Sequence, residues 1–152
     1  MKTLINGRWT DRKEEKQSND GSFKRKDTEF RNWITPDGSP GETGVGGFKA
    51  ESGRYHLYVS LACPWAHRTL IFRKLKNLEP HIGVSIVHPI MLENGWEFRT
   101  DFSQCTGDQI LGKNSIFEVY LAADKNITSR ASVPVLWDVK QATIVSNESS
   151  EI

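Results

Sequence analysis

Hydrophobic and polar positions change their spacing along the chain, and these changes predict the order of its elements. From Tyr55 the segment YHLYVSL is rich in aromatic and β-branched residues, which predicts a strand. The following segment, PWAHRTLIFRKLKNLEP, has apolar residues at helical spacing and predicts a helix that ends at Pro80. IGVSIVHPI then predicts a second strand. A strand, a crossover helix and a second strand form a right-handed βαβ unit with parallel strands.

The chain after this unit predicts a loop, a short helix and a hairpin. Residues 88–114 are irregular, and so long a loop in a compact domain is more often functional than idle. SIFEVYLAAD predicts a short helix capped by Ser115. SVPVLWD and ATIVSN alternate like the strands of a hairpin, and NESSEI opens like a helix capped by Ser146 or Asn147. This order predicts an α/β domain with a mixed sheet.

Residues 1–54 differ in composition from the rest of the chain, and this composition predicts an amino-terminal arm. They are charged, polar and dense in Gly and Pro, so they cannot hold a long regular element. The alternative is a disordered leader, but disordered segments are poor in aromatic residues. Five aromatic residues in the arm predict that it packs on the core: Trp9, Phe23, Phe30, Trp33 and Phe48. We therefore expect an arm over residues 1–54 and a domain over residues 55–152.

Composition and charge exclude several classes of partner. The 152 residues carry a net charge of +1 with acids and bases interleaved, which argues against nucleic acid or an anionic membrane as a partner. No apolar run approaches the ~18 residues that span a bilayer. The first residues do not resemble a signal peptide. Two cysteines make a poor disulfide framework, so we expect a cytoplasmic protein with both thiols free.

A cysteine stands where the first strand passes into the helix. Pro64 suits the first helical turn, which puts Cys63 at the N-cap, facing unpaired N–H groups and the positive end of the helix dipole. This position favours the nucleophilic thiolate, and His67 and Arg68 add positive potential. The alternative is that Cys63 is a small core residue that happens to precede a helix.

Alanine occupies the position where a second cysteine would complete a redox pair. Because Ala66 offers no thiol, a mixed disulfide on Cys63 must be resolved by an outside thiol. Glutathione is the abundant cytoplasmic thiol, so we predict a glutathione site beside Cys63. Cys105 could also resolve the disulfide, but it lies outside the motif and is expected to be passive. Cys63 and His67 lack a further pair at zinc spacing, so no metal is predicted.

Two further segments suit glutathione. SVPV places Pro134 at the start of a strand, and a cis bond there would present the Val133 N–H and C=O to the cysteinyl part of the peptide. The alternative is an ordinary trans proline at a strand edge. Glu148, Ser149 and nearby amides suit the ammonium and carboxylate of the γ-glutamyl group. The alternative there is a simple capping segment.

At this point the sequence resembles a known family. Five segments resemble the amino-terminal half of the glutathionyl-hydroquinone reductases, also called Xi-class glutathione transferases. They are RYHLYVSLACPWAHRTLIFRKLKNLE, HPIMLENGWEF, SVPVLWD, IVSNESSEI and FRNWITPDGSPGETGVGGF. The resemblance implies a thioredoxin-like glutathione S-transferase N-terminal domain with Cys63 as the catalytic nucleophile and Pro134 in a structural role. It implies glutathione contacts from Trp96, Arg130, Ala131, Ser132, Val133, Glu148 and Ser149.

The implied reaction reduces a glutathionyl-hydroquinone to the hydroquinone. The Cys63 thiolate attacks the conjugate sulfur, the ring carbon takes up a proton, and a mixed disulfide with glutathione is left on the enzyme. A second glutathione resolves it, giving oxidised glutathione in ping-pong kinetics. Two alternatives stay open: an Omega-like thioltransferase or dehydroascorbate reductase, and a non-catalytic thioredoxin-fold binding module.

The chain departs from this family at its end. Family members carry a helical carboxy-terminal domain that holds tyrosines for proton transfer and the hydroquinone pocket, whereas this chain stops at Ile152. We therefore expect a truncated chain that keeps most of the glutathione site and has little activity. An uncovered apolar sheet face should favour association or poor stability. For the full-length form the resemblance implies a homodimer.

Overall fold

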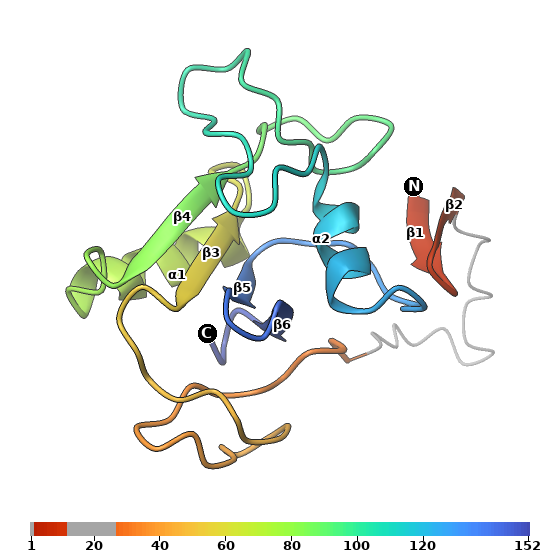
Figure 1. Cartoon of the computed structure of the whole chain (residues 1–152). Coiled ribbons are helices and arrows are strands. Elements are labelled where there is room, and N and C mark those ends of the chain that lie inside the picture. The colour runs from red at the N-terminus through yellow and green to blue at the C-terminus, as the bar shows by residue number, and fades with distance from the viewer. Residues whose placement is uncertain (1, 12–26) are drawn as a thin grey trace, which may run out of the picture.

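The computed structural model describes residues 2–11 and 27–152. Within the longer of these ranges, four strands form a mixed sheet in the order β4-β3-β5-β6 (Figure 1). They are β3 (Tyr55–Val59), β4 (Ile82–Ile86), β5 (Val135–Asp138) and β6 (Thr143–Ser146). β3 pairs parallel with β4 and antiparallel with β5, and β5 pairs antiparallel with β6. The predicted mixed sheet, with its parallel βαβ unit and its hairpin, is confirmed.

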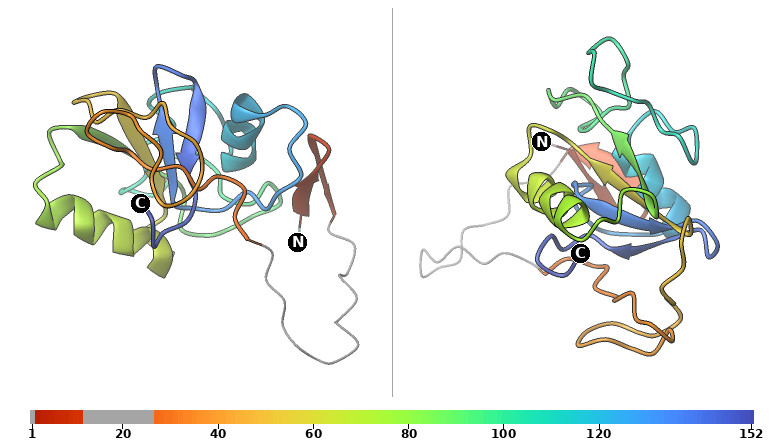
Figure 2. Two further views of the ribbon diagram at one scale, coloured as in Figure 1. Left: turned by 90° about the horizontal axis from the view of Figure 1, so that it is seen from below. Right: turned by 90° about the vertical axis from the view of Figure 1, so that its left-hand side faces the viewer.

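Two helices lie on opposite faces of this sheet, α1 (Pro64–Leu75) and α2 (Ile116–Ala123) (Figure 2). Successive side chains of a strand point to opposite faces, so Leu57 faces α1 while its neighbour Tyr58 faces α2. Tyr58, Tyr120 and Trp137 are the largest fully buried side chains of the core. Across the described residues, no helix has the length and apolar character that crossing a membrane requires.

Local capping sets the start of α2, which was predicted correctly, and the end of α1, which was predicted wrongly. α2 begins after Ser115 with a capping box to Glu118, as predicted. α1, however, ends at Leu75 and not at Pro80. Asn77 adopts a positive φ of 54°, and the Leu78 N–H donates to the Arg73 carbonyl at 2.9 Å. Asparagine tolerates this left-handed conformation, so the helix stops before the proline is reached.

An amino-terminal hairpin was not predicted. β1 (Lys2–Ile5) and β2 (Arg8–Asp11) pair antiparallel around Asn6 and Gly7, which both have positive φ. An Asn-Gly pair between alternating residues is a strong hairpin signal, and this sequence contained it. The hairpin lies beside α2, where Trp9 stacks on Phe117 with the ring centroids 4.7 Å apart (Figure 1).

The part of the predicted arm from residue 27 onward passes along the edge of the sheet and below it (Figure 1). The Asn32 N–H donates to the Val145 carbonyl of β6 at 3.0 Å. Phe30 and Phe48 pack against the core, whereas Phe23 lies outside the described residues. The division of the chain at residue 54 stays a prediction.

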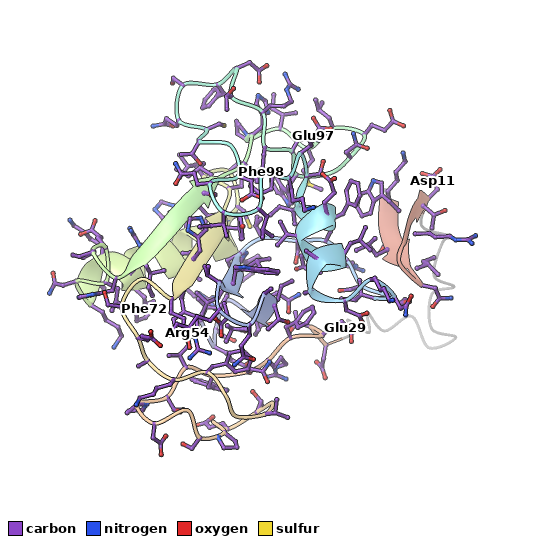
Figure 3. The ribbon with its side chains drawn as sticks, viewed as in Figure 1. Asp11, Glu29, Arg54, Phe72, Glu97 and Phe98 are labelled. Carbon is purple, nitrogen blue, oxygen red and sulfur yellow. The ribbon has the colours of Figure 1, made fainter. Side chains whose placement is uncertain are left out.

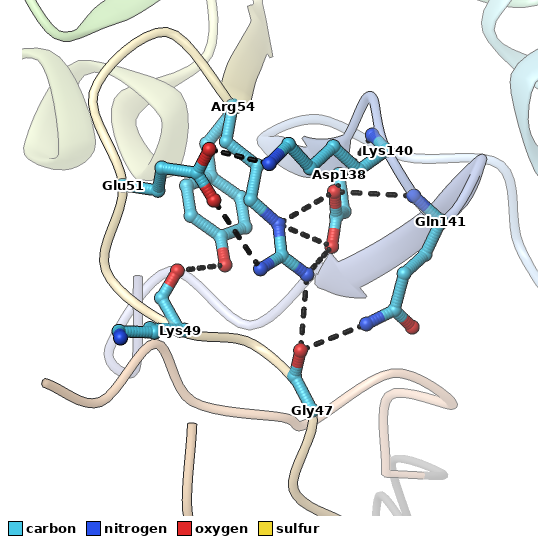
Figure 4. A network of polar contacts seen from close by, with 8 residues as sticks. Gly47, Lys49, Glu51, Arg54, Asp138, Lys140 and Gln141 are labelled. Atoms are coloured by element: carbon cyan, nitrogen blue, oxygen red, sulfur yellow. Dashed lines mark hydrogen bonds and ion pairs between the residues drawn. The ribbon is translucent and has the colours of Figure 1, made fainter. Parts of the chain in front are cut away.

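A buried ion pair joins β5 to the residues that enter β3. Arg54 Nη2 lies 2.5 Å from Asp138 Oδ2, Arg54 Nε donates to both carboxylate oxygens at 3.0 Å, and Asp138 is fully buried (Figure 4). The hydrogen bonds that Arg54 donates to Asp138 raise the pKa of Arg54. Arg54 also donates to the Gly47 carbonyl at 3.0 Å, as does Gln141 Nε2 at 2.8 Å. The ion pair therefore holds the arm against the sheet, where Figure 3 places Arg54.

An apolar cavity of about 910 Å³ lies between α1 and the sheet, with residues 149–152 at its border. Leu57 and Leu136 of the sheet and Phe72 of α1 line it, and Phe72 is half exposed (Figure 3). Ile71 and Leu75 add exposed apolar surface to the same helix. Whether this surface causes association stays a prediction.

Replacing Arg54 by methionine should destabilise the domain strongly, because the variant leaves the Asp138 carboxylate buried without its partner. Breaking a buried pair in this way costs about 3–5 kcal/mol, which urea unfolding will measure. The matched control is Lys140→Met, which removes the exposed ion pair with Glu51 and should have a much smaller effect. Equal losses for the two variants would contradict the prediction.

Stability should fall as the pH falls from about 6.5 to about 4, because His56 is buried and burial lowers its pKa to about 4. The unfolded chain then binds a proton that the folded chain does not, so acid favours unfolding. In His56→Gln, the fall in the free energy of unfolding between pH 6.5 and pH 4 should be smaller than in wild type by roughly 3 kcal/mol, as measured by urea unfolding at each pH. His81→Gln, which changes an exposed ring, is the control, and identical pH profiles for H56Q and wild type would refute the assignment.

Candidate functional site

Cys63 lies at the amino end of α1, as predicted. Its backbone is extended, with φ −98° and ψ 115°, and its carbonyl accepts the first helical hydrogen bond from His67 N at 3.0 Å. The side chain is partly exposed, and its Sγ lies 3.5 Å from the Val133 carbonyl oxygen. The thiol is therefore at the surface end of the helix and not buried inside the core.

The start of α1 supplies backbone N–H groups beside this thiol. No acidic residue lies in the first turn of α1, and the unpaired N–H groups of that turn carry the positive end of the helix dipole. Arg68, one turn further on, holds its guanidinium 4.8 Å from the centroid of the Trp65 ring. The site thus combines a partly exposed thiol with the positive end of a helix.

Val133 brings a second backbone segment to Cys63. The Val133–Pro134 peptide bond is cis, which was the first of the two alternatives that the sequence left open. The Val133 carbonyl accepts from Cys63 Sγ, and no described residue accepts a hydrogen bond from the Val133 N–H. Val133 itself is buried. Ala131 and Ser132 precede it, both partly buried.

Residues 147–149 form the third part of the site. Ser149 is buried and Glu148 is partly buried, and the Ser146 hydroxyl accepts the Glu148 N–H at 3.2 Å. Arg68 reaches this segment from α1, with its Nη1 3.5 Å from Ser149 Oγ. The predicted terminal helix is here a single turn, in which the N–H groups of residues 151 and 152 both donate to the Glu148 carbonyl.

Trp96 and Arg130 lie less close to these groups. Trp96 packs against the core, and its carbonyl accepts the Ile116 N–H at the start of α2 at 2.9 Å. Arg130 is exposed, and its carbonyl accepts from the Ser129 hydroxyl at 3.1 Å. No hydrogen bond or ring contact recorded among the described residues joins either side chain to Cys63. Their predicted roles toward glutathione stay predictions.

The second cysteine has a different environment. Cys105 Sγ donates to the Val87 carbonyl at 3.4 Å, and burial raises the pKa of this thiol. Both cysteines are free, as predicted. The described residues contain no group of three or more metal-ligating side chains.

The large cavity described above meets the candidate site only at one edge. Arg68 and Ser149 line it, whereas Cys63 and Val133 do not. A smaller hollow of about 410 Å³ lies on the outer side of α1 and includes Pro64 and His67.

Comparisons with known proteins agree with this geometry. Residues 62–152 match the family model described as glutathione S-transferase, N-terminal domain. The chain is 58% identical over 152 residues to the glutathionyl-hydroquinone reductase YqjG of Escherichia coli (strain K12), covering all of this chain and 46% of that protein.

Solved structures give the same result. The glutathione-bound structure of YqjG from Escherichia coli K-12 matches 80% of this chain and 40% of its own, at 63% identity and a TM-score of 0.79. A Xi-class glutathione transferase from Natrialba magadii matches 99% of this chain and 42% of its own, at 43% identity and a TM-score of 0.82.

The chain thus spans about half the length of the proteins that it matches. The likeness to the glutathionyl-hydroquinone reductases and the thioredoxin-like fold that the sequence predicted are both confirmed. Because the family model covers more than half of its residues, the chain belongs to the glutathione S-transferase N-terminal domain family.

Proposed function

We propose that this chain forms the glutathione-binding part of a glutathionyl-hydroquinone reductase in which Cys63 is the nucleophile. The observation that carries the proposal is the partly exposed Cys63 thiol at the amino end of α1, 3.5 Å from the Val133 carbonyl, with alanine in place of a resolving cysteine at position 66. The identity to a named reductase over the whole chain supports it.

Each part of the site has a role in holding glutathione. The N–H and C=O of Val133 pair with the cysteinyl residue of the peptide, which directs its sulfur toward Cys63. The carboxylate of Glu148 binds the γ-glutamyl ammonium, and the Ser149 hydroxyl binds its carboxylate beside Arg68. The glutathione-bound structure of the Escherichia coli relative supports glutathione as the ligand.

The loops around these groups complete the glutathione site. Arg130, Ala131 and Ser132 lead into Val133, so they set the direction in which its backbone faces the peptide. Trp96, on the loop before α2, contributes an aromatic surface at the edge of the site. Pro134 separates this loop from β5, which begins one residue later.

The reaction proceeds in two displacements at sulfur. The Cys63 thiolate attacks the sulfur of the conjugate, the bond between sulfur and the ring breaks, and the ring carbon takes up a proton, which releases the hydroquinone. A second glutathione thiolate then attacks the mixed disulfide on Cys63, which releases glutathione disulfide and the free thiolate. Overall, the ring carbon gains two electrons and a proton, while the thioether sulfur of the conjugate and the thiol sulfur of the second glutathione are oxidised together to the disulfide.

Mass spectrometry should find a glutathione adduct on Cys63 after incubation with a glutathionyl-menadiol conjugate. Cys63→Ser should abolish the adduct, and Cys105→Ser, the matched control, should retain it, because only Cys63 lies at a helix start. An adduct that forms from glutathione disulfide but not from the conjugate would indicate an Omega-like thioltransferase. If C63S kept glutathione binding and no adduct formed in any variant, a binding module would replace the proposal.

Cys63 should react with iodoacetamide faster than Cys105 in the folded protein at pH 7. The helix start favours the thiolate of Cys63, whereas burial raises the pKa of the Cys105 thiol. Peptide mass spectrometry over time measures both rates in one sample. In concentrated urea the two rates should converge, and equal rates in the folded protein would count against Cys63 as an activated nucleophile.

A further inference from the structure

One buried hydroxyl group connects two segments that are distant in the sequence. Tyr120 of α2 is fully buried, and its Oη donates to the Ser132 carbonyl at 3.1 Å. The same oxygen accepts from Asn147 Nδ2 at 2.9 Å and lies 3.4 Å from the Ser132 N–H. Tyr120 therefore contacts both the loop before β5 and the segment after β6.

Hydrogen bonds with Phe30 also hold Asn147 in place. It is buried, its Oδ1 accepts the Phe30 N–H at 3.2 Å, and its own N–H donates to the Phe30 carbonyl at 3.1 Å. The Phe30 ring meets the Tyr120 ring edge to face, with the centroids 6.2 Å apart. The side-chain oxygen and nitrogen of Asn147 therefore each have a hydrogen-bond partner. Moving this residue would break these buried hydrogen bonds, which costs free energy.

The next residue in each connected segment belongs to the proposed glutathione site. Val133 follows Ser132 and pairs with the cysteinyl part, while Glu148 follows Asn147 and binds the γ-glutamyl group. The last ladder pair on this side joins Leu136 of β5 to Ser146 of β6, so the sheet brings the two segments near each other, and Tyr120 connects them beyond the end of the ladder. Glutathione must bridge the distance between the two segments, and its affinity depends on that distance.

We propose that Tyr120, with Asn147 as its partner, is a positioning residue that fixes the spacing between residues 130–133 and residues 147–149. The proposal rests on the proposed function in so far as these two segments bind glutathione. Tyr120 does not touch glutathione, because it is buried beneath them. Burial also raises its pKa, so the hydroxyl keeps its proton and donates to Ser132 at neutral pH.

The chain offers a matched control. Tyr58 is a second fully buried tyrosine, and its hydroxyl donates to Asp108 at 2.9 Å in the loop of residues 88–114. Tyr58→Phe removes a buried hydrogen bond of the same kind without touching either glutathione segment. A general loss of stability should therefore appear in both variants, whereas a change of spacing should appear only in Tyr120→Phe.

Glutathione titration calorimetry on wild type, Y120F and Y58F tests the proposal. Y120F should weaken glutathione binding about tenfold, the equivalent of one lost hydrogen bond, and Y58F should stay within about twofold of wild type. Asn147→Ala should weaken glutathione binding by a similar factor. The Y120F/N147A double variant should weaken it by less than the product of the two single-variant factors. The alkylation rate of Cys63 at pH 7 should not change. Equal affinities for Y120F and Y58F would overturn the proposal.

Hydrogen exchange without ligand separates this proposal from the proposed function. In Y120F, amide exchange should rise together in residues 130–133 and 147–149, and in Y58F it should not. If wild type failed to bind glutathione but exchange rose in both segments, the proposed function would fail and the link through Tyr120 would stand. A rise in only one segment, or in neither, would overturn the link itself.

Discussion

The positive end of α1 is the feature on which the rest of the site depends. Pro64 starts the helix where its missing N–H costs nothing, and β3 delivers the chain to that point from the centre of the sheet. No acidic residue in the first turn opposes a negative charge there. Cys63 therefore lies where the unpaired N–H groups of the first turn face its side chain, and the Val133 carbonyl lies 3.5 Å from its sulfur.

A glutathione site made from separate segments needs something to fix their spacing. The hairpin holds the chain before Arg130, because Leu4 and Ser129 exchange two backbone hydrogen bonds, at 3.0 and 3.1 Å. Phe30 holds Asn147 from the opposite side. The amino-terminal residues thus brace both segments from outside while Tyr120 joins them from inside, so the arm contributes to the site without supplying a reacting group.

The sequence predicted what short-range chemistry determines. The cap at Ser115 and the position of Cys63 depend on neighbours within a few residues, the βαβ unit follows from the order of adjacent elements, and all three were confirmed. The end of α1 was misplaced because Asn77 stops the helix before the more familiar signal of a proline. The roles of Tyr120 and the Arg54–Asp138 pair could not be predicted, because their partners are far along the chain and a tyrosine in an apolar helix resembles ordinary core.

In the proposed reaction, the alanine at position 66 requires an external thiol to complete the cycle. Ala66 is fully buried on the side of α1 that faces the sheet, so it leaves no thiol within reach of a mixed disulfide on Cys63. Cys105 donates to the Val87 carbonyl, in a separate loop. In that reaction the second thiol would approach the exposed side of Cys63, at the positive start of α1.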